Sequence, residues 1–172
     1  LPDDRTGEEG AGTRVEVIEE SVRVSQALRA IGTRLDATPF MVRLALLKAF
    51  LSRLCGQDDV RVGSPVSGRD RTELEALVGM FVNTLALRTD VSGDPSFAGV
   101  VERVRRTCLE AFAHQEHPYD RLVERLNPAR DPRQAPLLPV LFASGQALGA
   151  VSAAGLTADP QDSEIANGGE AA

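Results

Sequence analysis

The sequence predicts an α/β fold in which helices pack on one β-sheet. Two hydrophobic periodicities alternate along the 172 residues: a period of two, typical of strands, and a spacing of three and four residues, typical of helices. They follow each other in the order strand, two helices, two strands, two helices, strand. Because a complete doubly wound domain alternates more regularly, this order indicates a single lobe of a larger fold.

The first predicted elements are a strand and a helix. Residues 1–12 are polar and glycine-rich, as in a linker, and Val15 and Val17 then alternate with charged residues, as in a half-buried strand. Ser21 is a suitable N-cap for the helix that follows. Apolar residues recur at helical spacing as far as Leu35, so this helix should turn one face to the core.

The second predicted helix is apolar nearly all round. Thr38 and Pro39 form an N-cap and first-turn pair, and Gly56 is a suitable C-terminal stop. A helix that is apolar on all sides is expected to be buried on several of them. The short strand that follows, over residues 60–62, should break at a cluster that disfavours a regular ladder, namely Gly63, Ser64 and Pro65.

Two further helices are predicted between residues 94 and 127. Asp94 and Pro95 begin the first, whose apolar face runs to about His114. Pro118 begins a shorter helix, which Asn127 and the proline after it should end.

The remaining segments are a loop, a strand and a tail. Residues 69–80 are predicted to form a loop with a short helix, and residues 137–143 an apolar strand in which Pro139 indicates an edge or a bulge. The chain then becomes rich in glycine and alanine. We therefore expect the lobe to span residues 13–160 and to be followed by a flexible tail over residues 161–172.

An asparagine lies on the apolar face of the strand predicted within LVGMFVNTLALR, residues 77–88. Side chains alternate between the two faces of a strand, so Asn83 shares its face with Phe81, Leu85 and Leu87. A carboxamide there costs a few kcal/mol unless it is hydrogen-bonded. Asn83 therefore needs a partner, which the residues alone leave open as backbone, water or ligand.

The composition excludes several classes of partner. The net charge is −6 and the 19 basic residues are spread along the chain, so nothing indicates nucleic-acid binding. No apolar run approaches the ~20 residues that cross a membrane. Cys55 and Cys108 are expected to be reduced core thiols, as in a cytoplasmic protein. Because the chain begins at Leu1 without an initiator methionine, we expect it to be a piece of a longer polypeptide.

The residues indicate neither a self-sufficient catalytic group nor a metal site. His114 and His117 are the only histidines, and no third ligand stands at a matching offset. His114 is better explained as a residue that caps or packs at a helix C-terminus. GSPVSGR, residues 63–69, has the glycines of a phosphate loop but lacks its lysine and its length.

Several stretches, taken together, resemble the C-terminal subdomain of a condensation domain from nonribosomal peptide synthetases. LVGMFVNTLALR resembles the family motif Gly-x-Phe-Val-Asn-Thr, HQEHPYD at residues 114–120 resembles His-Gln-Asp-x-Pro-Phe-Glu, and VRVGSPVSGR matches the segment before them. RDPRQAPL, residues 130–137, resembles the last motif, Arg-Asp-x-Ser-Arg-Asn-Pro-Leu, with Arg133, Gln134 and Ala135 replacing its middle residues.

The resemblance implies a chloramphenicol-acetyltransferase-like fold, of which this chain is one lobe with helices packed on a mixed β-sheet. In the family, carrier proteins insert phosphopantetheine arms into a tunnel between two lobes, where an acceptor amine attacks a donor thioester. The implied floor-loop and tunnel residues are Gly63, Ser64, Pro65, Arg69, Gly79, Phe81, Asn83 and Thr84. Those with a structural role are His114, Gln115, Pro118, Tyr119, Arg130 and Pro136.

The resemblance also implies what the chain lacks. The family's His-His motif belongs to the first lobe and is not matched here, so no catalytic residue and no directly bound cofactor are expected, and the chain alone should be inactive. The expected partners are the N-terminal lobe, peptidyl carrier proteins and an adjacent adenylation domain. Asn83 should bond either the floor loop, about residues 63–80, or a bound arm. A segment crossing to the other lobe is expected at about residues 144–160.

Three functional readings follow. The chain is an enzyme part that provides a wall and the floor loop of the tunnel, or a non-catalytic remnant lobe that serves as a packing platform or a dock for carrier and adenylation domains. The changed residues 133–135 favour the remnant. A third reading is an independent interaction module that binds a partner through its uncovered inter-lobe face.

Overall fold

The computed structural model describes residues 15–69, 72–126, 137–144, 151–153 and 156–158. They divide into two compact units: one takes the described residues from 20 to 143, and the other takes residues 15–19 together with those from 144 onward. The linker predicted at 1–12, the tail predicted at 161–172 and the end of the last predicted helix lie outside the described residues.

The first two helices begin and end at the predicted capping residues. Helix α1 (Val22–Arg34) is preceded by Ser21, whose side chain accepts a hydrogen bond from the Val24 N–H. Helix α2 (Pro39–Cys55) is preceded by Thr38, whose hydroxyl accepts from the Met41 N–H at 3.3 Å. Gly56 ends α2 in the left-handed conformation, with φ 63°. Local signals therefore predicted both helices.

The sheet of the larger unit consists of two antiparallel strands and one extended segment. Strands β1 (Asp59–Val66) and β2 (Asn83–Asp90) pair along their whole length, from Asp59 opposite Asp90 to Val66 opposite Asn83. On the other edge of β1, Gly63 forms a parallel bridge to Leu141. The strand directions are therefore mixed, as expected for this α/β lobe.

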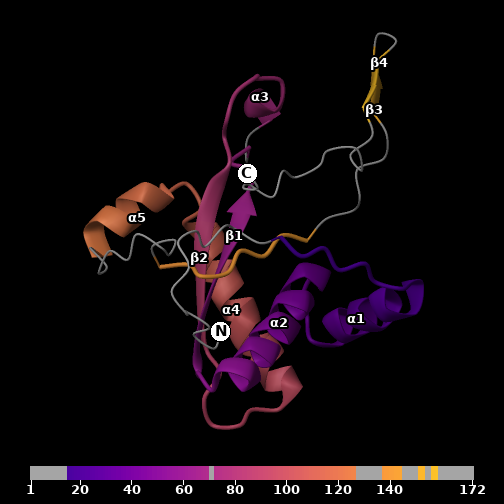
Figure 1. Cartoon of the computed structure of the whole chain (residues 1–172), viewed down its shortest axis with the longest axis vertical. Coiled ribbons are helices and arrows are strands. Elements are labelled where there is room, and N and C mark those ends of the chain that lie inside the picture. The colour runs from indigo at the N-terminus through magenta and orange to yellow at the C-terminus, as the bar shows by residue number, and fades with distance from the viewer. Residues whose placement is uncertain (1–14, 70–71, 127–136, 145–150, 154–155, 159–172) are drawn as a thin grey trace, which may run out of the picture. The chain divides into compact units, whose positions relative to one another are not determined.

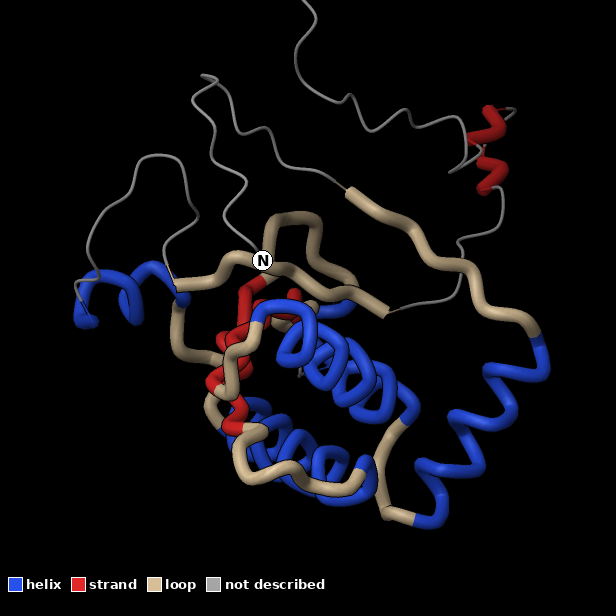
Figure 2. Tube along the Cα trace, turned by 60° about the horizontal axis from the view of Figure 1, so that its bottom comes forward, coloured by secondary structure: helices blue, strands red, loops and turns tan. Residues whose placement is uncertain are grey.

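Two helices cover one face of the strand pair. Helix α2 packs on β1, and helix α4 (Phe97–Ala113) packs on β2 and against α2, as Figures 1 and 2 show. Between them lies a closed apolar core, which includes Leu44, Val62, Leu87, Val101, Val104 and Cys108, all fully buried. Helix α1 packs on α2. The short helix α3 (Thr72–Glu75) precedes β2 in the sequence, and the short helix α5 (Tyr119–Leu126) packs against β2.

The smaller unit contains a hairpin that the sequence did not predict. Strands β3 (Val151–Ala153) and β4 (Leu156–Ala158) pair antiparallel, with Val151 opposite Ala158. Each strand has three residues, which is too short for a period of two to be recognised.

The strand predicted around Val15 and Val17 is wrong. Residues 15–20 have no regular structure, and Val17 and Ile18 are 80% and 85% exposed. An alternating pattern forms a strand only where a partner supplies ladder hydrogen bonds, and these residues make none in the described part of the chain.

The break predicted in β1 is also wrong. The strand continues through Gly63, Ser64 and Pro65. Both Gly63 backbone groups point away from β2: its N–H donates to Val140 O and its C=O accepts from the Phe142 N–H, each at 2.8 Å. Because backbone groups alternate along a strand, Pro65 also turns its nitrogen to that outer edge, and no bond to β2 is lost.

Two other predictions need correction. Residues 137–143 do not form a full strand, because among the described residues their ladder consists of the two hydrogen bonds at Gly63. Helix α2 is not buried on several sides either. Its inner face is closed, but its outer face leaves three large apolar residues about half exposed, namely Leu46, Phe50 and Leu54.

Candidate functional site

A hollow of about 440 Å³ opens beside the start of β2. Two segments far apart in the sequence form it: the loop of residues 72–82, called here the 72–82 loop, and the loop that joins α4 to α5 at residues 114–118. Much of its lining is apolar, with an amide and a carboxylate on the α4–α5 side. The lining residues are Gly68, Leu74, Met80, Phe81, Val82, Asn83, Gln115, Glu116 and Pro118.

Asn83 connects β2 to the α4–α5 loop by three hydrogen bonds. Its Nδ2 donates to Gln115 O at 2.9 Å and to His117 O at 2.8 Å, and its Oδ1 accepts from the Tyr119 N–H at 3.1 Å. Both amide protons and one oxygen lone pair are therefore satisfied. The predicted need for a partner is confirmed, but the bonds go to the backbone of the α4–α5 loop rather than to the floor loop.

Arg69 makes the corresponding connection inside the 72–82 loop. Its Nη1 donates to Leu74 O and, at 2.8 Å, to Leu77 O, and its Nη2 donates to Gly79 O at 3.2 Å. The guanidinium carbon lies 4.5 Å from the centroid of the Phe81 ring, a cation–π distance. One side chain thus holds three carbonyls of the same loop.

Gly68 allows the loop to close at its base. Its φ is +63°, and a Cβ atom placed on it would lie 2.0 Å from Phe81 O. Any other residue would be strained by the backbone angle and blocked by that carbonyl. The chain entering the loop and the chain leaving it therefore touch at Gly68 and Phe81.

The structure separates the predicted floor-loop residues into three groups. Phe81 and Asn83 line the hollow, and Arg69 and Gly79 form the internal bonds of the 72–82 loop. The others belong to the strand pair: Gly63, Ser64 and Pro65 lie in β1, and Thr84 lies opposite Pro65 in β2.

The described residues among those predicted to have a structural role cap α4, line the hollow or bond to Asn83. His114 caps the C-terminus of α4, with its N–H bonded to Ala111 O and its Nδ1 2.9 Å from Glu110 O. Gln115 and Pro118 line the hollow, and the Tyr119 N–H donates to Asn83. Arg130 and Pro136 lie outside the described residues.

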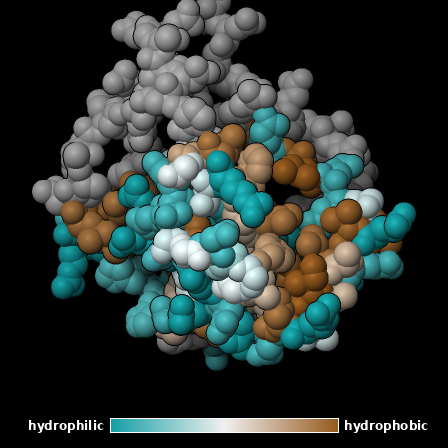
Figure 3. Space-filling model, turned by 90° about the horizontal axis from the view of Figure 1, so that it is seen from below, coloured by the Kyte–Doolittle hydropathy of each residue, from teal (hydrophilic) through white to brown (hydrophobic). Residues whose placement is uncertain are grey.

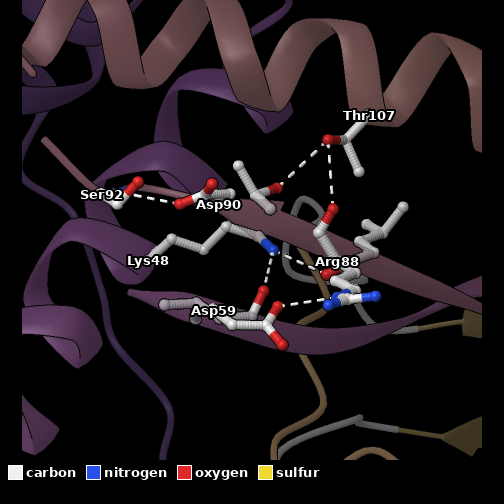
Figure 4. A network of polar contacts seen from close by, with 9 residues as sticks. Lys48, Asp59, Arg88, Asp90, Ser92 and Thr107 are labelled. Atoms are coloured by element: carbon white, nitrogen blue, oxygen red, sulfur yellow. Dashed lines mark hydrogen bonds and ion pairs between the residues drawn. The ribbon is translucent and has the colours of Figure 1, made fainter. Parts of the chain in front are cut away.

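The only lysine of the chain lies in the core beneath the strand pair. Lys48 is fully buried on α2, and its Nζ donates to Val60 O in β1 at 2.9 Å and to Leu87 O in β2 at 2.6 Å (Figure 4). Burial disfavours the ammonium and lowers the pKa of Lys48 to about 8. Burial likewise raises the pKa of the neighbouring Cys108 thiol to about 11. This site was not predicted, although a lone lysine among apolar residues was a visible signal.

A polar network at the far end of the strands holds them to α4. Arg88 donates to Asp59 at 2.8 Å across the pair, and the Thr107 hydroxyl of α4 donates to Arg88 O at 3.3 Å (Figure 4). Arg103 donates to Asp90 O and Ser92 O. These bonds fix β2 against α4, and the hollow lies at the opposite end of β2.

Two other kinds of site are absent from the part of the chain that the structure describes. Within the described ranges, no three His, Cys, Asp or Glu side chains gather in a way that would hold a metal ion. None of the helices described is long and apolar enough to cross a membrane.

Comparison with known proteins identifies the family. The model of the condensation domain matches residues 1–162. The chain belongs to the condensation-domain family. It is 52% identical over 120 residues to phosphinothricin tripeptide synthetase PhsB of Streptomyces viridochromogenes, which covers 70% of this chain and 10% of that protein. It is 47% identical over 134 residues to malpibaldin synthetase of Mortierella alpina, covering 78% of this chain and 2% of that protein. The chain thus spans a small part of the length of these relatives.

Solved condensation domains share the fold. The first condensation domain of the calcium-dependent antibiotic synthetase, in complex with a substrate analogue, is 33% identical with a TM-score of 0.58, over 62% of this chain and 24% of that one. Holo-AB3403, a four-domain nonribosomal peptide synthetase bound to AMP and glycine, is 27% identical with a TM-score of 0.68, over 70% of this chain and 9% of that one. The predicted family and fold class are confirmed, and the chain corresponds to part of a condensation domain.

Proposed function

We propose that the chain is the C-terminal half of a condensation domain and supplies one wall and the floor of the tunnel in which carrier-bound thioesters are joined by amide bonds. Its partners in this role are an N-terminal lobe and peptidyl carrier proteins, which bring their own phosphopantetheine arms. The two free thiols, Cys55 and Cys108, suit a cytoplasmic setting for this reaction.

The meeting of two motif segments at one hollow carries this proposal. The segments that resemble family motifs, residues 79–84 and 114–120, are joined by the three hydrogen bonds of Asn83, although the bonded residues are 32 to 36 positions apart. Both segments contribute to the lining of the hollow. The meeting of two separate motif segments at one hollow supports its assignment as a binding surface.

The lining suits an extended chain of methylenes and amides. Met80, Phe81 and Val82 offer apolar surface, and Gln115 offers an amide beside them. Ligand sites are commonly apolar with a few polar groups that fix orientation. A phosphopantetheine arm has this chemistry, and it would enter as part of a carrier protein.

The lining of the hollow contains no histidine, the side chain that most often accepts a proton as a general base. Amide formation requires the acceptor amine to attack the thioester carbonyl and to lose one proton, while the C–S bond breaks and the sulfur leaves as a thiolate that takes up a proton. Among the residues that line the hollow, Glu116 is the one ionisable side chain and none is a histidine. We infer that the proton acceptor comes from the N-terminal lobe and that this chain alone forms no amide.

Complementation tests this proposal directly. The chain is mixed with the N-terminal lobe of a related condensation domain and two loaded carrier proteins, and the amide product is measured by mass spectrometry. Product should form with both lobes and be absent when either lobe is omitted. Amide formation by this chain alone, or association of the lobes and carriers without product, would contradict the proposal.

A second function, a non-catalytic docking platform, is favoured by the outer face of α2. Leu46, Phe50 and Leu54 recur every four residues and so form one apolar row on that helix. Figure 3 shows hydrophobic surface on the side of the unit where α1 and α2 lie. Exposed apolar rows of this kind mark contact surfaces. Stable association with a carrier or adenylation domain, without amide product in the complementation assay, is the expected result for this function.

A further inference from the structure

The 72–82 loop has little regular structure to hold it in place. Its helix, α3, has only four residues. After α3, the described part of the loop has one backbone hydrogen bond, from the Leu77 N–H to Leu74 O at 3.3 Å. The loop also turns apolar side chains to solvent, since Val78 and Met80 are almost completely exposed. Burial of its own side chains therefore contributes little to its conformation.

Arg69 compensates for this lack of internal structure. Its acceptors, the carbonyls of Leu74, Leu77 and Gly79, span half of the loop. A planar guanidinium with five N–H donors can reach several carbonyls at once in a fixed geometry, whereas an ammonium is a point charge. The three bonds therefore depend on an arginine at this position.

Arg69 also lies where the two ends of the loop meet. Its guanidinium stacks on the Phe81 ring, and the residue before it, Gly68, is in direct contact with Phe81 O. Phe81 and Gly68 are both lining residues of the hollow. Any change in the Arg69 contacts is therefore transmitted to the wall of the hollow.

We propose that Arg69 is the positioning residue of the 72–82 loop: its bonds to three loop carbonyls and its stacking on Phe81 keep the loop closed and set the width of the hollow. This inference rests on the proposed function only in that the hollow is taken as the tunnel floor. Its three acceptors are neutral carbonyls.

Backbone NMR relaxation on the 172-residue chain tests the proposal without any partner lobe. In the unchanged protein, amides of residues 74–80 should have order parameters near the ~0.85 of rigid backbone, and in Arg69→Gln they should fall below ~0.6. Arg69→Lys should lower them as well, because an ammonium cannot span the three carbonyls. Arg61→Gln is the matched control, since Arg61 is exposed in the middle of β1, and it should leave the loop unchanged.

Chemical rescue separates positioning from general stabilisation. Adding guanidinium ion to Arg69→Ala at non-denaturing concentration should restore the order of residues 74–80 while β2 stays unchanged throughout. The proposal is overturned if the loop is equally ordered in Arg69→Gln, if it is already flexible in the unchanged protein, or if α4 and β2 loosen together with it.

A kinetic measurement links the loop to function independently. In the complemented domain, Arg69→Gln should raise KM for a carrier-bound substrate several-fold with a smaller effect on kcat, because the residue shapes the hollow and touches no reacting group. If Arg69→Gln makes the loop flexible but neither the unchanged protein nor any variant forms product, the role of Arg69 is supported and the proposed tunnel function is rejected. If product forms but the loop order is the same in Arg69→Gln, the tunnel function is supported and the role of Arg69 is rejected.

Discussion

Replacing Asn83 with leucine should lower stability by an amount that its hydrogen bonds determine. Two of the three bonds, to Gln115 O and from the Tyr119 N–H, are partly buried, and the third, to His117 O, is exposed. Each partly buried bond contributes about 0.5–1.5 kcal/mol net, and the exposed carbonyl regains water at little cost. The expected loss is therefore about 1–3 kcal/mol. For a chain of this size that corresponds to a decrease in Tm of roughly 2–4 °C per kcal/mol.

Thermal and urea unfolding followed by circular dichroism measure this loss. Thr84→Val is the matched control, because the neighbouring residue points to the opposite face of β2 and the change should stay within about 0.5 kcal/mol. If Asn83→Leu melts within about 1 °C of the unchanged protein, its hydrogen bonds do not hold the α4–α5 loop to β2 as described. Retained binding of a phosphopantetheine arm by the destabilised variant would show that the residue acts through structure rather than as a ligand contact.

Two further substitutions test the buried lysine and the base of the loop. Lys48→Met should stabilise the protein by about 1–3 kcal/mol at pH 7, since it removes a desolvated ammonium. The folded-state pKa of Lys48, about 8, is below its unfolded value. The stability of the unchanged protein should therefore rise between pH 8 and about 10.5, and the stability advantage of Lys48→Met should shrink over that range. A stability difference that stays constant across this range would refute the lowered pKa of Lys48. Gly68→Ala should lower the free energy of unfolding by at least ~2 kcal/mol, because of its positive φ and the contact with Phe81 O. The control Gly56→Ala, with the same φ and open space around it, should lower it by about 1 kcal/mol. Equal losses of stability in urea unfolding would contradict the close contact at Gly68.

Local signals in the sequence predicted the ends of α1 and α2, whereas α4 begins at Phe97 after the N-cap Ser96 and not at Asp94 and Pro95 as predicted. The caps at Ser21 and Thr38 and the stop at Gly56 act within one helical turn, and all three are where they were expected. The faces of β2 were also predictable, because Leu85 and Leu87 are buried as the alternation requires. These elements depend on residues that are close in sequence.

The errors arose where a distant segment decides the local structure. β1 continues through Pro65 because residues 140–142 occupy the other edge at Gly63, nearly 80 residues away in the sequence. Val15 and Val17 have the pattern of a strand without a partner among the described residues. Tertiary pairing overrode local preference in both cases.

The candidate site was predictable in part. The apolar neighbours of Asn83 showed that its side chain needs a hydrogen-bond partner. They did not show which partner, because nothing in the local sequence connects residue 83 with residues 115–119. The role of Arg69 was hidden for a related reason. Its acceptors are backbone carbonyls, which every residue carries, so no pattern of side chains indicates them.

In the proposed function, where acyl groups arrive as thioesters, the isolation of Lys48 has a chemical consequence. Thioesters acylate free primary amines without discrimination, and a lysine near the entry of such a substrate would become a dead-end acceptor. Here the sole ε-amine is enclosed in the core, and every other cationic side chain apart from histidine is a guanidinium, which stays protonated and does not attack thioesters. The surface of this chain thus offers passing acyl groups no competing lysine nucleophile.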